Sequence, residues 1–115
     1  MDNHTKQTGL KTFFRIMEVW GLREAEGLQL LDLDLDHQPE ASKLTIDQLE
    51  RISHTLAIYK ALNTLLNEAS ADAWIQKPNS APLFGGKAAL DLLKIGTQGF
   101  RDVRTYLVAQ VGSLD

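Results

Sequence analysis

The run from Thr45 to Asn67 constrains the fold more than any other stretch of this 115-residue chain. Thr45 is a favourable helix N-cap, and Gln48 three residues later completes a capping box, so a helix should begin there. Apolar residues recur along the run at helical spacing: Leu49, Ile52, Leu56, Tyr59, Leu62 and Leu66 form one stripe, and Ile58, Ala61 and Leu65 extend it. An apolar face this wide lies in a core or in a dimer interface, so the sequence predicts a protein built from packed helices.

Helical spacing of apolar residues predicts five more helices. The expected fold class is therefore all-α, a compact bundle of about five to six helices. Gly21 and Gly96 stand where helix C-caps are expected, and Ser70 and Thr97 are candidate N-caps. The additional helices are expected at Leu10–Trp20, Arg23–Leu31, Ala69–Gln76, Lys87–Ile95 and Gln98–Val111.

The residue types needed for catalysis are missing or scattered. The absence of cysteine excludes disulfides and thiolate chemistry. The histidines, His4, His37 and His54, lie in unrelated contexts, and no serine sits in a nucleophile-elbow pattern. The tripeptide 85–87 (Gly-Gly-Lys) lacks the glycine spacing and the preceding strand of a phosphate-binding loop. The sequence therefore predicts no enzymatic activity, no cofactor and no metal site.

The sequence offers two candidate metal sites, one at His54 and one at the spaced aspartates that follow Leu31. His54 has no second metal-binding side chain at i+3 or i+4, so we expect it to be exposed to solvent. The spacing of Asp32, Asp34 and Asp36 is that of a calcium-binding loop, but the sixth and twelfth positions hold His37 and Lys43 instead of glycine and glutamate. An acidic loop, or a short strand covered on one face, is the better interpretation.

Negative charge is concentrated in one part of the chain. Residues 31–50 contain one basic residue, Lys43, against six acidic residues, a local net charge of −5 within an overall −3. A surface that binds DNA gains most of its affinity by neutralising phosphates, which this segment would repel. No apolar run is long enough to span a membrane and no signal peptide opens the chain, so we expect a cytoplasmic protein without a membrane partner.

The stretch from Trp74 to Leu93 carries a turn-rich loop between two helices. Pro78 should end the helix before it, and Gly85-Gly86 permits backbone angles that other residues resist and a close approach of another surface. Trp74 and Phe84 bracket the loop, and we expect them to hold it against a helical core. The next helix would begin with unpaired N–H donors and Lys87.

These motifs resemble a known family. The pattern W-x-x-x-P-N, then P-L-F-G-G-K, L-D-L-L and V-R-x-Y-L is similar to the toxin-binding domain of the Xre/MbcA/ParS antitoxins, and Leu44–Leu62 resembles their linker helix. The resemblance covers roughly Met17–Gly112. It implies an antitoxin that acts as a homodimer and occludes the active site of a cognate toxin, often a RES-domain toxin that consumes NAD. It also implies a flexible N-terminus at 1–11, an Xre-like lobe with its linker helix at 12–66 and a toxin-binding domain at 67–115.

The resemblance also suggests which residues meet the toxin and which form the core. The expected toxin contacts are Phe84, Gly85, Gly86 and Lys87, together with Arg101 or Arg104. The alternative is that Phe84 and the glycines only make a turn that closes the local core. The expected core residues of the domain are Trp74, Pro78, Leu90, Leu93, Val103 and Leu107.

The N-terminal lobe departs from the family pattern. Its opening, helix–Gly21–helix, matches the start of an Xre-type helix-turn-helix, which makes a DNA-binding autoregulator the alternative function. After Leu31, however, the chain continues as DLDLDHQPEASK, with no arginine between Arg23 and Arg51. Base readout needs Arg, Lys, Asn or Gln at an exposed helix end, so operator DNA is disfavoured as a partner.

Overall fold

The computed structural model describes residues 1–36 and 38–114, and every named element in those ranges is a helix. Of the described residues 68% are helical, which confirms the all-α bundle. The elements are α1 (Asn3–Val19), α2 (Glu24–Leu30), the 3₁₀ turn η1 (Ala41–Lys43), α3 (Ile46–Leu65), α4 (Glu68–Ala73), the 3₁₀ turn η2 (Trp74–Gln76), α5 (Ala89–Leu93) and α6 (Thr97–Gly112). No helix in the described ranges is both long and apolar enough to cross a membrane.

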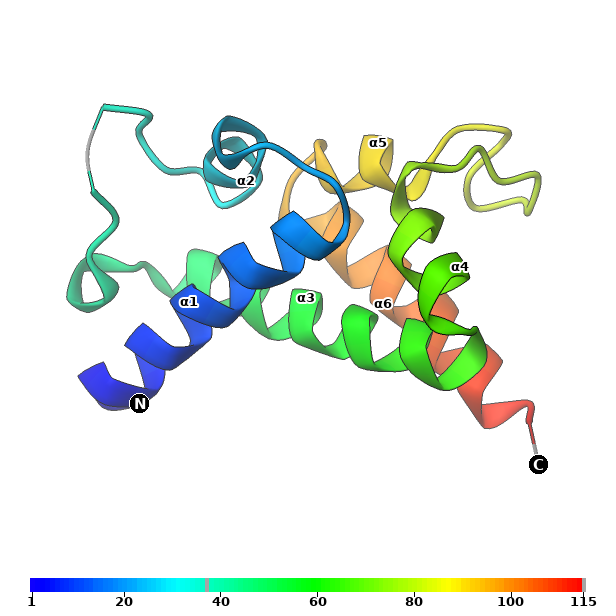
Figure 1. Cartoon of the computed structure of the whole chain (residues 1–115), viewed down its shortest axis with the longest axis horizontal. Helices are drawn as coiled ribbons and strands as arrows, with labels where there is room; N and C mark the ends of the chain where they lie inside the picture. The colour runs from blue at the N-terminus through cyan, green and yellow to red at the C-terminus, as the bar shows by residue number, and fades with distance from the viewer. Residues whose placement is uncertain (37, 115) are drawn as a thin grey trace.

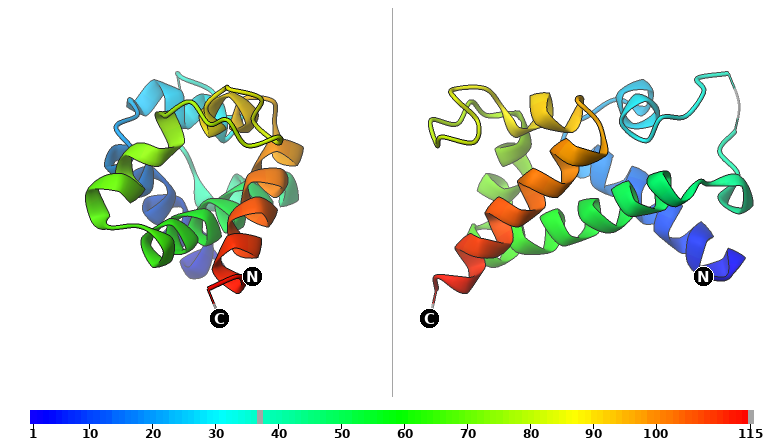
Figure 2. Two further views of the ribbon diagram at one scale, coloured as in Figure 1. Left: turned by 90° about the vertical axis from the view of Figure 1, so that its right-hand side faces the viewer. Right: turned by 180° about the vertical axis from the view of Figure 1, so that it is seen from behind.

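Helix α3 is the central element of the bundle. It runs along the length of the molecule, and α1 crosses its N-terminal half (Figure 1). Helix α6 packs along its other side, as the view from behind shows (Figure 2). The predicted start of α3 is confirmed, because the Thr45 hydroxyl accepts from the Gln48 N–H at 3.0 Å and the Gln48 side chain accepts from the Thr45 N–H at 2.9 Å.

The face that α3 buries agrees in part with the predicted stripe. Leu56 and Leu66 lie at its exposed edge, with 36% and 37% of their surface accessible. The buried positions are Gln48, Ile52, Thr55, Ile58, Ala61 and Leu62. Helices α1 and α6 both pack against α3. The polar Thr55 is tolerated in the core because its hydroxyl donates to the Arg51 carbonyl at 2.8 Å.

Several helix starts differ from the sequence-based expectation, and in two of them another residue supplies the cap. Helix α1 begins at Asn3 instead of Leu10, since the Asp2 carboxylate accepts from the Thr5 N–H at 2.7 Å. Helix α4 is capped by Asn67, whose side chain accepts from the N–H of Ser70, the predicted cap. Helix α5 begins at Ala89, two residues after the predicted Lys87.

One hydrophobic core runs through the described chain. It joins residues of α1 such as Phe13 and Met17 to residues of α6 such as Phe100 and Leu107. Two polar contacts also tie the halves together: Arg51 donates to the Thr97 hydroxyl at 2.8 Å, and the Gln76 amide donates to the Trp20 carbonyl at 2.7 Å. The expected division at residue 66 therefore crosses a continuous core, and it stays a prediction.

Candidate functional site

The loop between η2 and α5 is closed by its own backbone. Pro78 and Ala88 form an isolated antiparallel bridge, and the Asn79 N–H donates to the Lys87 carbonyl at 3.0 Å. The Asn79 carbonyl accepts from the Gly86 N–H at 2.8 Å, and the Asn79 side chain accepts from the Ala81 N–H at 2.9 Å. Asn79 thus satisfies both ends of the turn, and we call residues 78–88 the closed loop.

The glycine pair serves the backbone conformation of this loop. Gly85 and Gly86 have φ of 57° and 91°, in the left-handed region that residues with a Cβ resist. A Cβ built on either glycine would meet nothing within 4 Å, so no neighbouring segment of the chain requires their small size. Gly85, Gly86 and Lys87 are exposed, which leaves this strip of backbone open to another molecule.

The prediction of unpaired N–H donors at this point is wrong. The Gly85 N–H donates to the Ala81 carbonyl at 3.1 Å, and the Lys87 N–H donates to the Phe84 carbonyl at 3.0 Å. The Ala88 N–H, at the start of α5, donates to the Asp91 carboxylate at 3.1 Å. These N–H groups all donate to acceptors within the turn or at the start of α5, so they are not available to bind an anion. The closed loop therefore presents a shaped surface and no anion-binding site.

Three aromatic rings hold the closed loop to the helical core, as the bracketing of the loop by Trp74 and Phe84 predicted. The Phe84 ring lies edge-on to Trp74 at 5.6 Å and edge-on to Tyr106 of α6 at 5.1 Å, both between ring centroids. Trp74 and Tyr106 stack at 6.4 Å. Such geometry is favourable for aromatic pairs. Only 2% of Phe84 is accessible. The prediction that Phe84 contacts the toxin therefore needs correction, because its side chain is buried inside the molecule.

The assignment of Pro78 to the core also needs correction. Pro78 is exposed, and it holds the closed loop through its backbone bridge to Ala88. Trp74 is half-buried within the aromatic cluster. The remaining residues assigned to the core are buried: Leu90, Leu93, Val103 and Leu107.

The two arginines of α6 take part in a polar network with α3. Arg101 donates to both carboxylate oxygens of Glu50, with one distance of 2.9 Å, and its side chain is 49% accessible. Arg104 donates to the Nδ1 atom of His54 at 3.1 Å. Because an arginine can only donate, Nδ1 of His54 carries no proton, and its Nε2–H donates to Glu50 at 2.8 Å.

His54 is therefore not the exposed residue that the sequence suggested, since only 12% of its side chain is accessible. The network also sets the charge of Glu50. Its pKa is lowered to about 2 from the ordinary 4.5, chiefly by the hydrogen bonds from Arg101 and then by the one from His54. The Glu50 carboxylate, held by Arg101 and His54, ties α3 to α6 over about one helical turn.

The closed loop and this network do not form one surface. Tyr106, which holds the loop, follows Arg101 by five positions in α6. Five residues turn a helix through about 140° relative to the starting direction, so the two side chains leave α6 on different faces. The predicted toxin contacts therefore divide into an exposed strip at Gly85–Lys87 and a separate pair of arginines already bonded within the chain.

Comparison with known proteins identifies the C-terminal half. A family model described as the antitoxin Xre/MbcA/ParS C-terminal toxin-binding domain matches residues 61–112. A relative in Sinorhizobium fredii (strain NBRC 101917 / NGR234), the uncharacterized protein y4oB, is 37% identical over 110 residues, which cover 90% of this chain and 84% of the relative. The chain belongs to the Xre/MbcA/ParS antitoxin family. No solved structure matches it.

The toxin-binding domain of this antitoxin-family protein begins inside α3 and includes α4, the closed loop, α5 and α6. It therefore contains the exposed strip at Gly85–Lys87 and the aromatic cluster. Sequence reasoning missed that Tyr106, quoted only as part of a motif, completes this cluster. It also missed Glu50, although Glu50 and His54 share one helix face at i, i+4 and Arg101 and Arg104 share another at i, i+3. In the described ranges no group of three or more His, Cys, Asp or Glu residues could hold a metal ion.

Proposed function

We propose that the protein is the antitoxin of a type II toxin–antitoxin pair, which neutralises a cognate toxin by covering its active site. The observation that carries this proposal is the toxin-binding domain at residues 61–112 with its exposed closed loop. The toxin is proposed to be of the NAD-consuming RES class, which follows from the family resemblance. An antitoxin acts by binding, and this role requires no catalytic group of its own.

The closed loop is the proposed contact because it combines exposure with fixed geometry. Gly85, Gly86 and Lys87 are exposed, and Leu83 beside them has 38% of its surface accessible. The backbone beneath is held by the bridge at Pro78 and the buried ring of Phe84. A surface that is ordered before binding loses little conformational entropy in the complex, which suits a protein that must occupy a pocket tightly.

The two arginines take a smaller part in this proposal. Arg101 is half-exposed and could reach a toxin only while sharing its guanidinium with Glu50. Arg104 is partly buried and bonded to His54. We therefore place the main contact at Leu83 and at residues 85–87 and treat Arg101 as a rim residue, where charges contribute little to affinity.

Co-expression tests the proposal. The reading frame beside this gene is expressed as the candidate toxin, with and without the antitoxin, and growth and the cellular NAD level are measured. We expect growth arrest and NAD loss with the toxin alone and recovery of both with the antitoxin. A neighbouring frame without toxicity, or toxicity that the antitoxin leaves unchanged, contradicts the proposal.

The alternative function is DNA-binding autoregulation through α1 and α2. The turn between them, with Gly21 at φ 77°, favours it. Two observations oppose it: α2 opens with the acidic Glu24 and Glu26, and the described residues between α2 and η1 contain no helix. A gel-shift titration with the upstream DNA at several salt concentrations decides between them. Binding with a negative salt slope supports the regulator, and no binding removes it.

The homodimer that the resemblance implies also belongs to the proposal. Sedimentation of the purified protein over a range of concentrations tests it. A monomer at all concentrations contradicts this part of the proposal without affecting the antitoxin role.

A further inference from the structure

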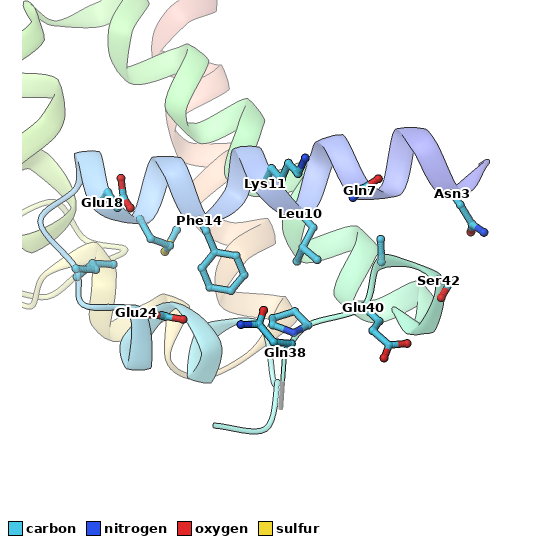
Figure 3. Close-up of a pocket in the computed structure, with 14 residues that line it drawn as sticks. Asn3, Gln7, Leu10, Lys11, Phe14, Glu18, Glu24, Gln38, Glu40 and Ser42 are labelled. Atoms are coloured by element: carbon cyan, nitrogen blue, oxygen red, sulfur yellow. The ribbon is translucent and has the colours of Figure 1, made fainter. Parts of the chain in front are cut away.

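A groove of about 840 Å³ lies in the N-terminal lobe, outside the toxin-binding domain. One wall is α1, and the other is formed by the start of α2 and by residues 38–42 (Figure 3). Leu10 and Phe14 point into the space from α1, and Met17, Leu22 and Pro39 also line it. Its floor is therefore apolar, although it lies between two stretches rich in charge.

The size of the groove corresponds to a short helix. A helix with side chains is about 10 Å across and rises about 5.4 Å per turn, so one turn occupies roughly 420 Å³. The groove thus has room for about two turns. Between Leu30 and Ala41 the described chain forms turns and no helix, so it provides no element of its own to fill this space.

The charges at the rim define what could bind there. Glu18, Glu24 and Glu40 line the groove, against the single basic residue Lys11. Arg15 lies 3.6 Å from Glu18, and Lys43 lies 3.4 Å from Glu40. Both ion pairs are exposed, and exposed ion pairs contribute little to stability. Within the described ranges Glu24 forms no ion pair. Asp32, Asp34 and Asp36 continue the acidic character beyond Pro39.

We propose that this groove binds a basic, apolar-faced helical segment of a partner protein. The apolar side of the segment would cover Phe14, which is only partly buried, and the neighbouring floor. Lysine or arginine residues on its flanks would meet the three glutamates at the rim. Helix-in-groove recognition uses this division between apolar anchors and charged edges. The inference does not depend on the antitoxin role, because the closed loop belongs to the other half of the chain.

Helix α1 of a second copy is a poorer occupant. Its exposed face carries polar side chains such as Lys11 and Arg15, and its apolar residues Phe13, Ile16 and Met17 are already buried. It would therefore bring no apolar stripe to the groove.

The test uses the full-length protein and a labelled 14-residue lysine–leucine peptide with amphipathic helical spacing. A scrambled peptide of the same composition and a glutamate–leucine peptide are the controls. We expect the amphipathic lysine peptide to bind at least tenfold more tightly than either control. In ¹H–¹⁵N spectra the shifted amides should cluster at residues 7–18 and 38–42. Equal binding of the scrambled peptide, or shifts centred elsewhere, overturns the proposal.

Two substitutions at helix starts give a matched comparison. Glu24 is in the first turn of α2 and lines the groove, whereas Glu68 is in the first turn of α4, away from it. We expect Glu24→Gln to lower the affinity for the lysine peptide about twofold to fivefold at low salt, which is the effect of losing one exposed charge pair. Glu68→Gln should leave the affinity unchanged. Phe14→Ala should weaken it further, provided that circular dichroism shows a folded protein.

Equal effects of Glu24→Gln and Glu68→Gln would show attraction to the net charge alone and would overturn the proposal. Self-association that the peptide displaces, seen by sedimentation, would assign the groove to a second copy and would overturn it as well.

Discussion

Two irregular segments of similar length behave differently in this molecule. The closed loop, residues 78–88, buries Phe84 and closes on itself through Asn79. The acidic segment, residues 32–40 with position 37 outside the description, leaves Leu33 partly accessible and Leu35 with 55% of its surface accessible. The difference shows that an irregular segment becomes a fixed surface when one large side chain enters the core and the backbone donors find partners nearby.

The contrast extends to the halves that contain the two segments. In the C-terminal half the elements approach closely: a Cβ on Gly99 of α6 would lie 1.8 Å from the Leu92 carbonyl oxygen. In the N-terminal half a Cβ on Gly9 of α1 would lie 3.4 Å from Ile52, an ordinary contact, and the groove beside α1 stays open. The C-terminal half brings α6 against the backbone of Leu92 at Gly99, whereas the N-terminal half leaves the groove beside α1 open, although Gly27 packs closely on Met17 and Phe14.

The largest expected effect is the loss of stability when an apolar side chain of each segment is truncated. Phe84→Ala should destabilise the protein by about 3–5 kcal/mol, because it leaves a cavity between Trp74 and Tyr106. Leu35→Ala should change stability by less than about 0.5 kcal/mol, since the side chain is largely exposed. Urea unfolding followed by circular dichroism measures both. Similar losses for the two variants would remove the distinction between the segments.

The second effect compares two glycines within helices. Gly99→Ala should cost about 3 kcal/mol, because a methyl group would overlap the backbone of Leu92 and separate α5 from α6. Gly9→Ala should stabilise α1 by about 0.5–1 kcal/mol through helix propensity. Thermal unfolding of both variants checks this, and a stable Gly99→Ala protein would contradict the close approach.

A smaller effect concerns residues with positive φ. Gly85→Ala and Gly86→Ala should each cost about 1–2 kcal/mol, because alanine resists their left-handed conformation although it has space. Asp32, at φ 55°, is the counterpart in the acidic segment. Asp32→Gly should stay within about 0.5 kcal/mol of the wild type, because relief of strain offsets the entropy that glycine adds to the unfolded chain. Denaturant midpoints distinguish these outcomes.

The smallest effect is the pH dependence from Glu50. Its folded pKa of about 2 lies below the ordinary 4.5, so between these values the unfolded chain binds more protons. The stability that this carboxylate contributes is therefore present above pH 4.5 and lost as the pH falls toward 2. In Glu50→Gln the denaturant midpoint should fall less steeply over that window than in the wild type. Equal slopes would contradict the tie between α3 and α6.

The sequence predicted the helical elements well because their signals are local. The capping box at Thr45 and the apolar spacing of α6 depend on neighbours within a turn or two. The candidate site was harder, because its geometry depends on residues far apart in the chain. The burial of Phe84 depends on Tyr106, and the partly buried His54 depends on Arg104, fifty residues later. The groove could not be foreseen, since it arises where the chain does not form a helix.

The central claim is that the closed loop is the toxin contact, and one pair of affinities tests it most directly. Calorimetry measures binding of the toxin from the adjacent reading frame to the wild type, to Leu83→Asp in the closed loop and to Leu35→Asp in the acidic segment. The account predicts at least about a 30-fold loss for Leu83→Asp, the cost of an interface hot spot, and less than a twofold change for Leu35→Asp. Equal losses, or a loss only for Leu35→Asp, would contradict it.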